Sequence, residues 1–146
     1  MAGEEGGGGG GMNWDYKELW RQRGNDSLVE VSHHQEIARD GDGPNRWCVY
    51  AYIYPDHPRF SLFVEGGGMF QAAAQDLPMH GGSICRASLV EPLRHGGETI
   101  TAWEVGADYS HDHDQEYTHF NTKDEASTVF FDAETLISFL NAEAKA

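Results

Sequence analysis

The chain has few cysteines and no long apolar run, and each shortage excludes a class of protein. Only Cys48 and Cys85 occur among 146 residues, each within a predicted strand, so neither a disulfide framework nor a zinc ribbon is indicated. We expect both thiols to be buried and to act as small apolar side chains. No apolar run approaches the roughly 20 residues that span a bilayer, and the N-terminus lacks the basic and apolar regions of a signal peptide. We therefore expect no membrane partner and a cytoplasmic location.

Basic residues are also scarce. Ten Lys and Arg residues against 24 Asp and Glu residues give a formal net charge of −14. This charge opposes docking on nucleic-acid phosphates or anionic membranes unless a metal or a local basic patch intervenes. Non-specific nucleic-acid binding is therefore disfavoured.

Several common catalytic motifs are missing as well. The chain has no G-x-S-x-G elbow, no Walker loop and no H-E-x-x-H helix, and the EGGG run at 65–68 lacks the lysine and hydroxyl residue of a phosphate loop. Cys85 and His80 could form a nucleophile and its base, but nothing in the sequence indicates the lowered thiol pKa that this chemistry needs.

The length fits one domain that follows a tail. Residues 1–11 contain six consecutive glycines and no apolar residue after Met1, so we expect a disordered Gly-rich tail. Residues 12–146 have room for a single domain of about 130 residues with one core.

Apolar patterning predicts strands in four stretches, residues 27–39, 46–55, 82–91 and 98–108. In the first, Val29, Val31 and His33 alternate with more polar neighbours. The second is apolar on both faces, so we expect it to lie centrally with one face against a helix.

Helical patterns flank these strands. Residues 13–26 carry spaced tryptophans before Gly24, a typical helix C-terminal residue. Near the other end, Thr122 and Glu125 have capping-box spacing, and Asp132 could cap an apolar stripe formed by Leu136, Ile137, Phe139 and Leu140. The predicted fold is α+β, a mostly antiparallel sheet of about four strands with N-terminal and C-terminal helices packed on one face.

Two histidines stand at predicted turns beside strands. His57 precedes Pro58, whose ring holds it in an extended conformation at a strand exit. His80 precedes Gly81 and Gly82, which permit a tight turn and close approach of another group.

The densest polar stretch is VGADYSHDHDQEYTH, residues 105–119, where three histidines and four acidic residues occur in fifteen positions. Asp108, His111 and Asp114 recur at intervals of three, so one helical turn or a bound ion would bring them to one side. Imidazole and carboxylate suit Zn²⁺, Fe²⁺ or Mn²⁺. We therefore predict a divalent transition metal, held at one point by His57, His80, Asp108 and His111. Asp114 would orient a ligand or act as general base toward metal-bound water.

The same residues have a structural alternative. Eight histidines in an acidic chain cluster somewhere by chance, and buried polar groups also pair with one another and with turn amides. His113 or His119 could replace His111 as a ligand. We treat His33, His34 and His95 as surface or strand residues.

Between residues 47 and 114 the chain resembles small uncharacterised proteins encoded by phages and prophages. These often carry an HP dipeptide after a strand, then an HGG turn before another strand, then G-x-D-x-x-H-x-x-D. Here the elements stand in that order as His57-Pro58, His80-Gly81-Gly82 and the segment 106–114. The family's turn usually continues toward a threonine and an aromatic residue, whereas this chain reads SIC at 83–85, and its spacer at 64–79 also differs. The resemblance implies a phage origin and a shared site, without an assigned activity.

Three functions remain open. The first is a phage or prophage accessory enzyme, a metal-dependent hydrolase of a phosphoester or another small polar substrate. The second is a non-catalytic acidic protein that binds and inhibits a host protein, for instance one with a basic surface. The third is a pocket that sequesters a small ligand through the same histidines and turns. Substrate, metal identity and oligomeric state are left undetermined.

Overall fold

The computed structural model describes residues 17–37, 41–80, 86–95, 98–109 and 114–145, and only the backbone of Lys17, 86–95 and 98–100. The predicted tail, residues 1–11, lies outside this part. Along the chain the elements are β1 (Lys17–Arg23), β2 (Ser27–Gln35), β3 (Asn45–Ile53), η2 (Phe60–Leu62), α1 (Ala72–Gln75), β4 (Arg86–His95), β5 (Glu98–Asp108), η3 (Gln115–His119) and α2 (Ser127–Lys145).

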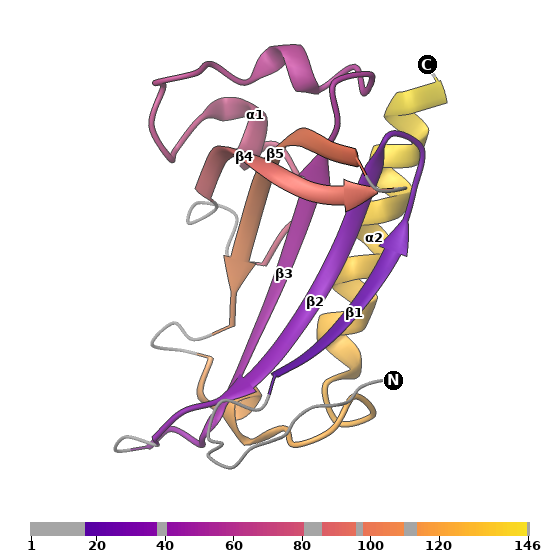
Figure 1. The fold of residues 1–146 in the computed structure, drawn as a ribbon. Coiled ribbons are helices and arrows are strands. Elements are labelled where there is room, and N and C mark those ends of the chain that lie inside the picture. The colour runs from indigo at the N-terminus through magenta and orange to yellow at the C-terminus, as the bar shows by residue number, and fades with distance from the viewer. Residues whose placement is uncertain (1–16, 38–40, 81–85, 96–97, 110–113, 146) are drawn as a thin grey trace.

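The strands form one antiparallel sheet in the order β1-β2-β3-β5-β4 (Figure 1). In β3, Val49 is paired with Val31 of β2 on one side and with Ala107 of β5 on the other. The prediction that this strand lies centrally is therefore confirmed. The α+β class is confirmed too, with five strands in the described residues where about four were expected.

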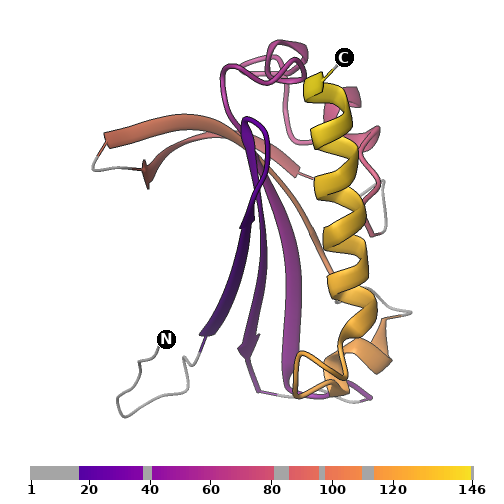
Figure 2. The ribbon, with the colours of Figure 1, turned by 90° about the vertical axis from the view of Figure 1, so that its right-hand side faces the viewer.

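Helix α2 packs along one face of the sheet, as Figure 2 shows from the side. The buried side chains of β2, β3 and β5 on this face alternate with residues on the opposite face, as strand geometry requires. Leu136 and Leu140 of the predicted apolar stripe are fully buried, as is Trp47 of β3, and Phe139 is partly buried against the same core. One half of the predicted capping box forms, since Glu125 N donates to Thr122 Oγ1 at 3.2 Å, while the Glu125 carboxylate accepts from Asn121 N at 2.7 Å.

The predicted N-terminal helix is wrong, because strand β1 occupies that stretch. Trp20 of β1 packs against Trp47 at a ring-centroid distance of 5.9 Å, while Leu19 points away from the core and is largely exposed. All seven residues of β1 pair with β2, and this pairing outweighs a weak local helical pattern. Gly24 is instead part of the turn to β2, where an added Cβ would lie 2.5 Å from Asn141 Oδ1.

The crossover, defined as residues 54–80, leads from β3 toward β4 and carries η2 and α1. Both ribbon views place its first part at the end of the molecule where α2 ends, and its last residue, His80, lies further back, beside Tyr109 (Figures 1 and 2). Arg59 joins the crossover to α2 through a paired contact with the Glu143 carboxylate, with its Nε 2.8 Å from Oε1, and also donates to Ala73 O at 2.9 Å. Among the described helices, none combines the length and apolar character needed to cross a membrane.

Candidate functional site

The candidate site consists of His80 and four side chains near it, which together we call the His80 cluster. His80 Nε2 lies 3.0 Å from both carboxylate oxygens of Asp114. The His80 ring stacks on Tyr109 at 4.1 Å between centroids, and Tyr117 meets it edge-on at 5.4 Å. Tyr109 in turn donates its hydroxyl to Asp132 Oδ2 at 2.7 Å. The cluster therefore brings together the crossover, the end of β5, the start of η3 and α2.

The carboxylate of Asp114 is almost wholly buried, whereas 19% of the His80 side chain is exposed. An ionised carboxylate only accepts hydrogen bonds, so the proton of a neutral His80 ring lies on Nε2 in this contact. A buried carboxylate also needs a partner that offsets its lost hydration. His80 supplies that partner, which explains why two residues 34 positions apart lie together.

Tyr109 lies against the His80 ring because the side chains of β5 alternate between the two faces of the sheet, and this alternation continues one residue past the end of the strand at Asp108. Val105 and Ala107 face the core, and Tyr109 follows on the same side, with its N–H bonded to Trp47 O at 3.0 Å. Burial raises the pKa of Tyr109, and its hydrogen bond to Asp132 raises it further, so the hydroxyl stays a donor at neutral pH. Burial also raises the pKa of Tyr117, followed by the charges of Asp132 and Asp114.

Asp132 was predicted as a helix cap, and the structure corrects this. Helix α2 begins at Ser127, so Asp132 lies inside it, where its carboxylate accepts the Tyr109 hydroxyl. The helix starts earlier because the turn at 122–126 already supplies the capping contacts.

His57 lies elsewhere and is engaged at both ring nitrogens. Its Nδ1 accepts the Arg59 N–H at 3.0 Å, so Nε2 carries the proton and donates to Leu140 O at 2.9 Å. Leu140 stands eight residues beyond Asp132 on α2, which corresponds to about 12 Å along the helix axis. His57 therefore fastens the crossover to α2 at a different level from the His80 cluster.

Asp108 is exposed and lies on the opposite face of the sheet. It is paired with Cys48 in the β3–β5 register, on the face that also carries Tyr50. Burial is the largest cause of the raised pKa of Tyr50 and Cys48 comes next, while the charge of Asp108 makes a smaller contribution. The structure thus unites only His80 and Asp114 from the predicted set. His111 and His113 lie outside the described residues, and His119 is exposed at the end of η3.

Within the described part of the chain, no group of three or more His, Cys, Asp or Glu side chains could hold a metal ion. Metal binding stays a prediction, and it now depends on residues outside the described part, among them His111 and its alternative His113. Two interactions argue against His57 as a ligand, because a metal would have to displace either the Arg59 N–H or the bond to the Leu140 carbonyl.

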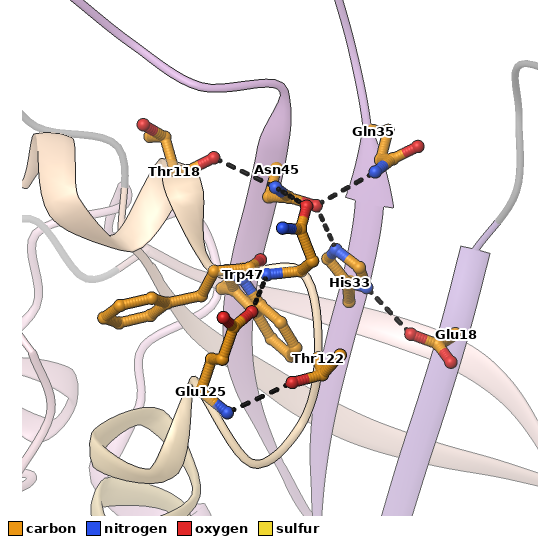
Figure 3. Close-up of polar contacts among 10 residues, drawn as sticks. Glu18, His33, Gln35, Asn45, Trp47, Thr118, Thr122 and Glu125 are labelled. Carbon is orange, nitrogen blue, oxygen red and sulfur yellow. Dashed lines mark hydrogen bonds and ion pairs between the residues drawn. The ribbon is translucent and has the colours of Figure 1, made fainter.

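A second polar cluster, centred on Asn45, lies at one end of the sheet (Figure 3). Asn45 Nδ2 donates to Thr118 O at 3.1 Å and to Asn121 Oδ1 at 3.0 Å. Its Oδ1 accepts from His33 Nε2 at 2.7 Å and from Gln35 Nε2 at 3.1 Å. These four bonds use the full capacity of an amide side chain. Asn45 therefore has a structural role, joining β2 and β3 to η3.

His33, treated from sequence as a surface or strand residue, is a strand residue that is buried. Its ring stacks on Trp47 at 4.1 Å, and its Nδ1 lies 2.8 Å from Glu18 Oε1 (Figure 3). Because Nε2 must donate to the oxygen of Asn45, the contact with Glu18 needs a second proton, on Nδ1 or on the carboxylate. The alternation that groups His33 with the buried valines of β2 was the signal for its burial.

The Asn45 cluster also supports the His80 cluster through η3. Thr118 Oγ1 accepts from Gly43 N at 2.6 Å and donates to Gln115 O at 2.5 Å, which fixes the turn that Asp114 begins. A side chain at Gly43 would place its Cβ 2.2 Å from Thr118 O, so only glycine allows this approach.

Comparisons with protein-family models, with curated proteins and with solved structures each found no match to this chain. The resemblance to phage and prophage proteins therefore stays a prediction from sequence, and the case for function depends on the geometry of the His80 cluster.

Proposed function

We propose that the protein is a small hydrolase in which His80 is the acid–base group and Asp114 positions it. The observation that carries this proposal is the contact of His80 Nε2 with both oxygens of a buried carboxylate. A carboxylate in this place selects one tautomer of the ring and stabilises the imidazolium that forms when the ring takes up a proton.

The surroundings of His80 support this role. Stacking on Tyr109 fixes the plane of the imidazole, and the hydrogen bond to Asp132 fixes Tyr109. A group held in this way loses little freedom when it meets a substrate, which is a main source of catalytic advantage. Its partial exposure also gives the ring access to solvent.

We propose a small polar substrate, with phosphoesters as the first class to test, and the cytoplasm of a phage or prophage host as the setting. A divalent metal could contribute by activating water, and the chain's own part would remain proton transfer at the His80 ring. The resemblance at His57-Pro58, His80-Gly81-Gly82 and 106–114 supports the phage origin.

The experiment measures hydrolysis of p-nitrophenyl phosphate, bis-p-nitrophenyl phosphate and p-nitrophenyl acetate, each with and without Zn²⁺ or Mn²⁺. His80→Gln should lower the observed rate by about 100-fold or more, and Asp114→Asn should lower it less. His34→Gln is the matched control, because His34 is a partly exposed histidine of β2 whose Nε2 lies 2.8 Å from the nearby Glu36 carboxylate, away from the His80 cluster. Activity retained in His80→Gln would contradict the proposal.

A second readout does not need a substrate. Nitrogen-15 NMR of the histidine rings should show neutral His80 as the Nε2–H tautomer, and Asp114→Leu should abolish this preference while the spectrum of the remaining core is unchanged. A wild-type ring in the Nδ1–H form would refute the proposed pairing, whatever the panel of substrates shows.

A further inference from the structure

The crossover displays large apolar side chains to solvent. Leu62 is 59% exposed, Val64 62%, Met69 45% and Phe70 57%. These four lie within nine residues and make up most of the largely exposed hydrophobic side chains in the described part of the chain. Scattered exposed apolar residues are normal, but several on one short segment mark an interaction surface. We call residues 60–71 the apolar loop.

The apolar loop is held in one conformation by its own hydrogen bonds. The Gln71 side chain accepts Val64 N–H at 2.6 Å and donates to Val64 O at 3.1 Å and Gly68 O at 2.9 Å. Gly66 and Gly68 have φ of +80° and +85°, a conformation that favours glycine. The turn between Val64 and Met69 is therefore closed and defined.

The base of the apolar loop is anchored in the core. Phe63 is buried and stacks on Trp103 at 5.2 Å between ring centroids, while its neighbours Leu62 and Val64 point outward. Phe63 and the partly buried Phe60, whose ring lies 6.3 Å from that of Trp103, thus anchor the loop, and the four exposed apolar side chains are not needed for this packing. An apolar surface that is already ordered binds a partner with a small loss of conformational freedom, which favours affinity.

Charge indicates the kind of partner. The exposed charged side chains of the crossover are all acidic, namely Asp56, Glu65 and Asp76. Its one Lys or Arg residue, Arg59, is buried and paired with Glu143. A second copy of this chain would bring its own charge of −14 and be repelled, whereas a basic partner would be attracted.

We propose that the apolar loop is a docking surface for a protein partner that presents a basic, amphipathic segment. Leu62, Val64, Met69 and Phe70 would contact the apolar face of that segment, and the three acidic residues would lie opposite its cations. This proposal is independent of His80, because the residues involved are not those of the His80 cluster.

The test uses the full chain and two synthetic 18-residue amphipathic peptides of the same pattern, one of Leu and Lys and one of Leu and Glu. Titration is followed by nitrogen-15 NMR. The Leu/Lys peptide should shift the signals of residues 62–71 in a saturable way, more weakly in high salt, and the Leu/Glu peptide should not. The double variant Val64→Ser with Phe70→Ser should weaken binding by at least about tenfold.

Phe131→Ser is the matched control, because Phe131 is a 66% exposed aromatic residue on α2, outside the apolar loop. This variant should bind the Leu/Lys peptide as the wild type does. The proposal is overturned if no signal shifts, if the shifts spread over the acidic surface without including 62–71, or if the double variant binds equally well. Light scattering adds one outcome, since a dimer that Val64→Ser with Phe70→Ser dissociates would identify a second copy as the occupant instead.

Discussion

Removal of the Glu143 carboxylate is the most direct perturbation of the link between the crossover and α2. The Arg59 side chain is 7% exposed and donates to both oxygens of Glu143, whose side chain is 27% exposed. Glu143→Leu would leave a buried guanidinium without this counter-charge, while its bond to Ala73 O and its contact with the Phe139 ring at 5.5 Å would remain. Removing one partner of a fully buried pair costs about 3–5 kcal/mol.

Solvent reaches part of Glu143, so we expect about 2–3 kcal/mol for Glu143→Leu in the free energy of unfolding. Arg59→Met should cost less, about 1–2 kcal/mol, because the remaining carboxylate can turn toward water while only the bond to Ala73 O is lost outright. The double variant should be no less stable than Glu143→Leu alone, since the two substitutions remove the same interaction.

The assay is urea unfolding followed by circular dichroism, with Glu134→Gln as control. Glu134 is an exposed acidic residue on the same helix, and its substitution should change the free energy of unfolding by less than about 0.5 kcal/mol. The reasoning is refuted if Arg59→Met costs more than Glu143→Leu, or if the two costs add fully in the double variant. Either result would mean that the pair is hydrated in solution.

Two further predictions concern the core and the response to alkali. Leu140→Ala should lower the free energy of unfolding by about 2–5 kcal/mol, because Leu140 is fully buried. Phe131→Ala should lower it by less than about 0.5 kcal/mol, because Phe131 is exposed. Equal costs in urea unfolding would show that α2 does not cover the sheet. Burial raises the pKa of Tyr52 and Tyr109 in the folded state. The contribution of these two neutral tyrosines to the free energy of unfolding is therefore complete below the unfolded pKa of about 10 and is lost as pH rises above it. The loss is up to about 1.4 kcal/mol per pH unit for each tyrosine. Tyr109→Phe should make the decline between pH 10 and 12 shallower, and an unchanged slope would contradict the proposed burial.

The strands were predictable where a local pattern alternates. In β2 and β3 the residues that face the core recur every second position; the observed β2 lies within the predicted stretch 27–39, and β3 starts one residue before the predicted stretch 46–55. In β5 the bounds coincide with the prediction. β1 was mispredicted, because its partner β2 supplies the pairing that its own sequence does not reveal.

The site was predictable only in part. The structure brings His80 and Asp114 into contact, but it does not place His57 and Asp108 with them, although the argument from turns beside strands had grouped all four. A turn tells which residues are displayed, whereas the face on which each one lies depends on the strand register. For Asp108 that register sends the side chain to the face away from α2.

What the sequence determined by itself is therefore local: the acidic surface, the alternating strands, the capping contact at Thr122 and Glu125, and the closing amphipathic helix. These follow from charge, from the two-residue period of strands and from contacts three to four residues apart. Tertiary structure decided the order of the strands, the stacking of His80 on Tyr109 and the bond of His57 to the Leu140 carbonyl. The pairing of β3 with β5, the stacking and the bond each join residues at least 29 positions apart, and such partners are selected by the packing of the whole domain rather than by neighbouring sequence.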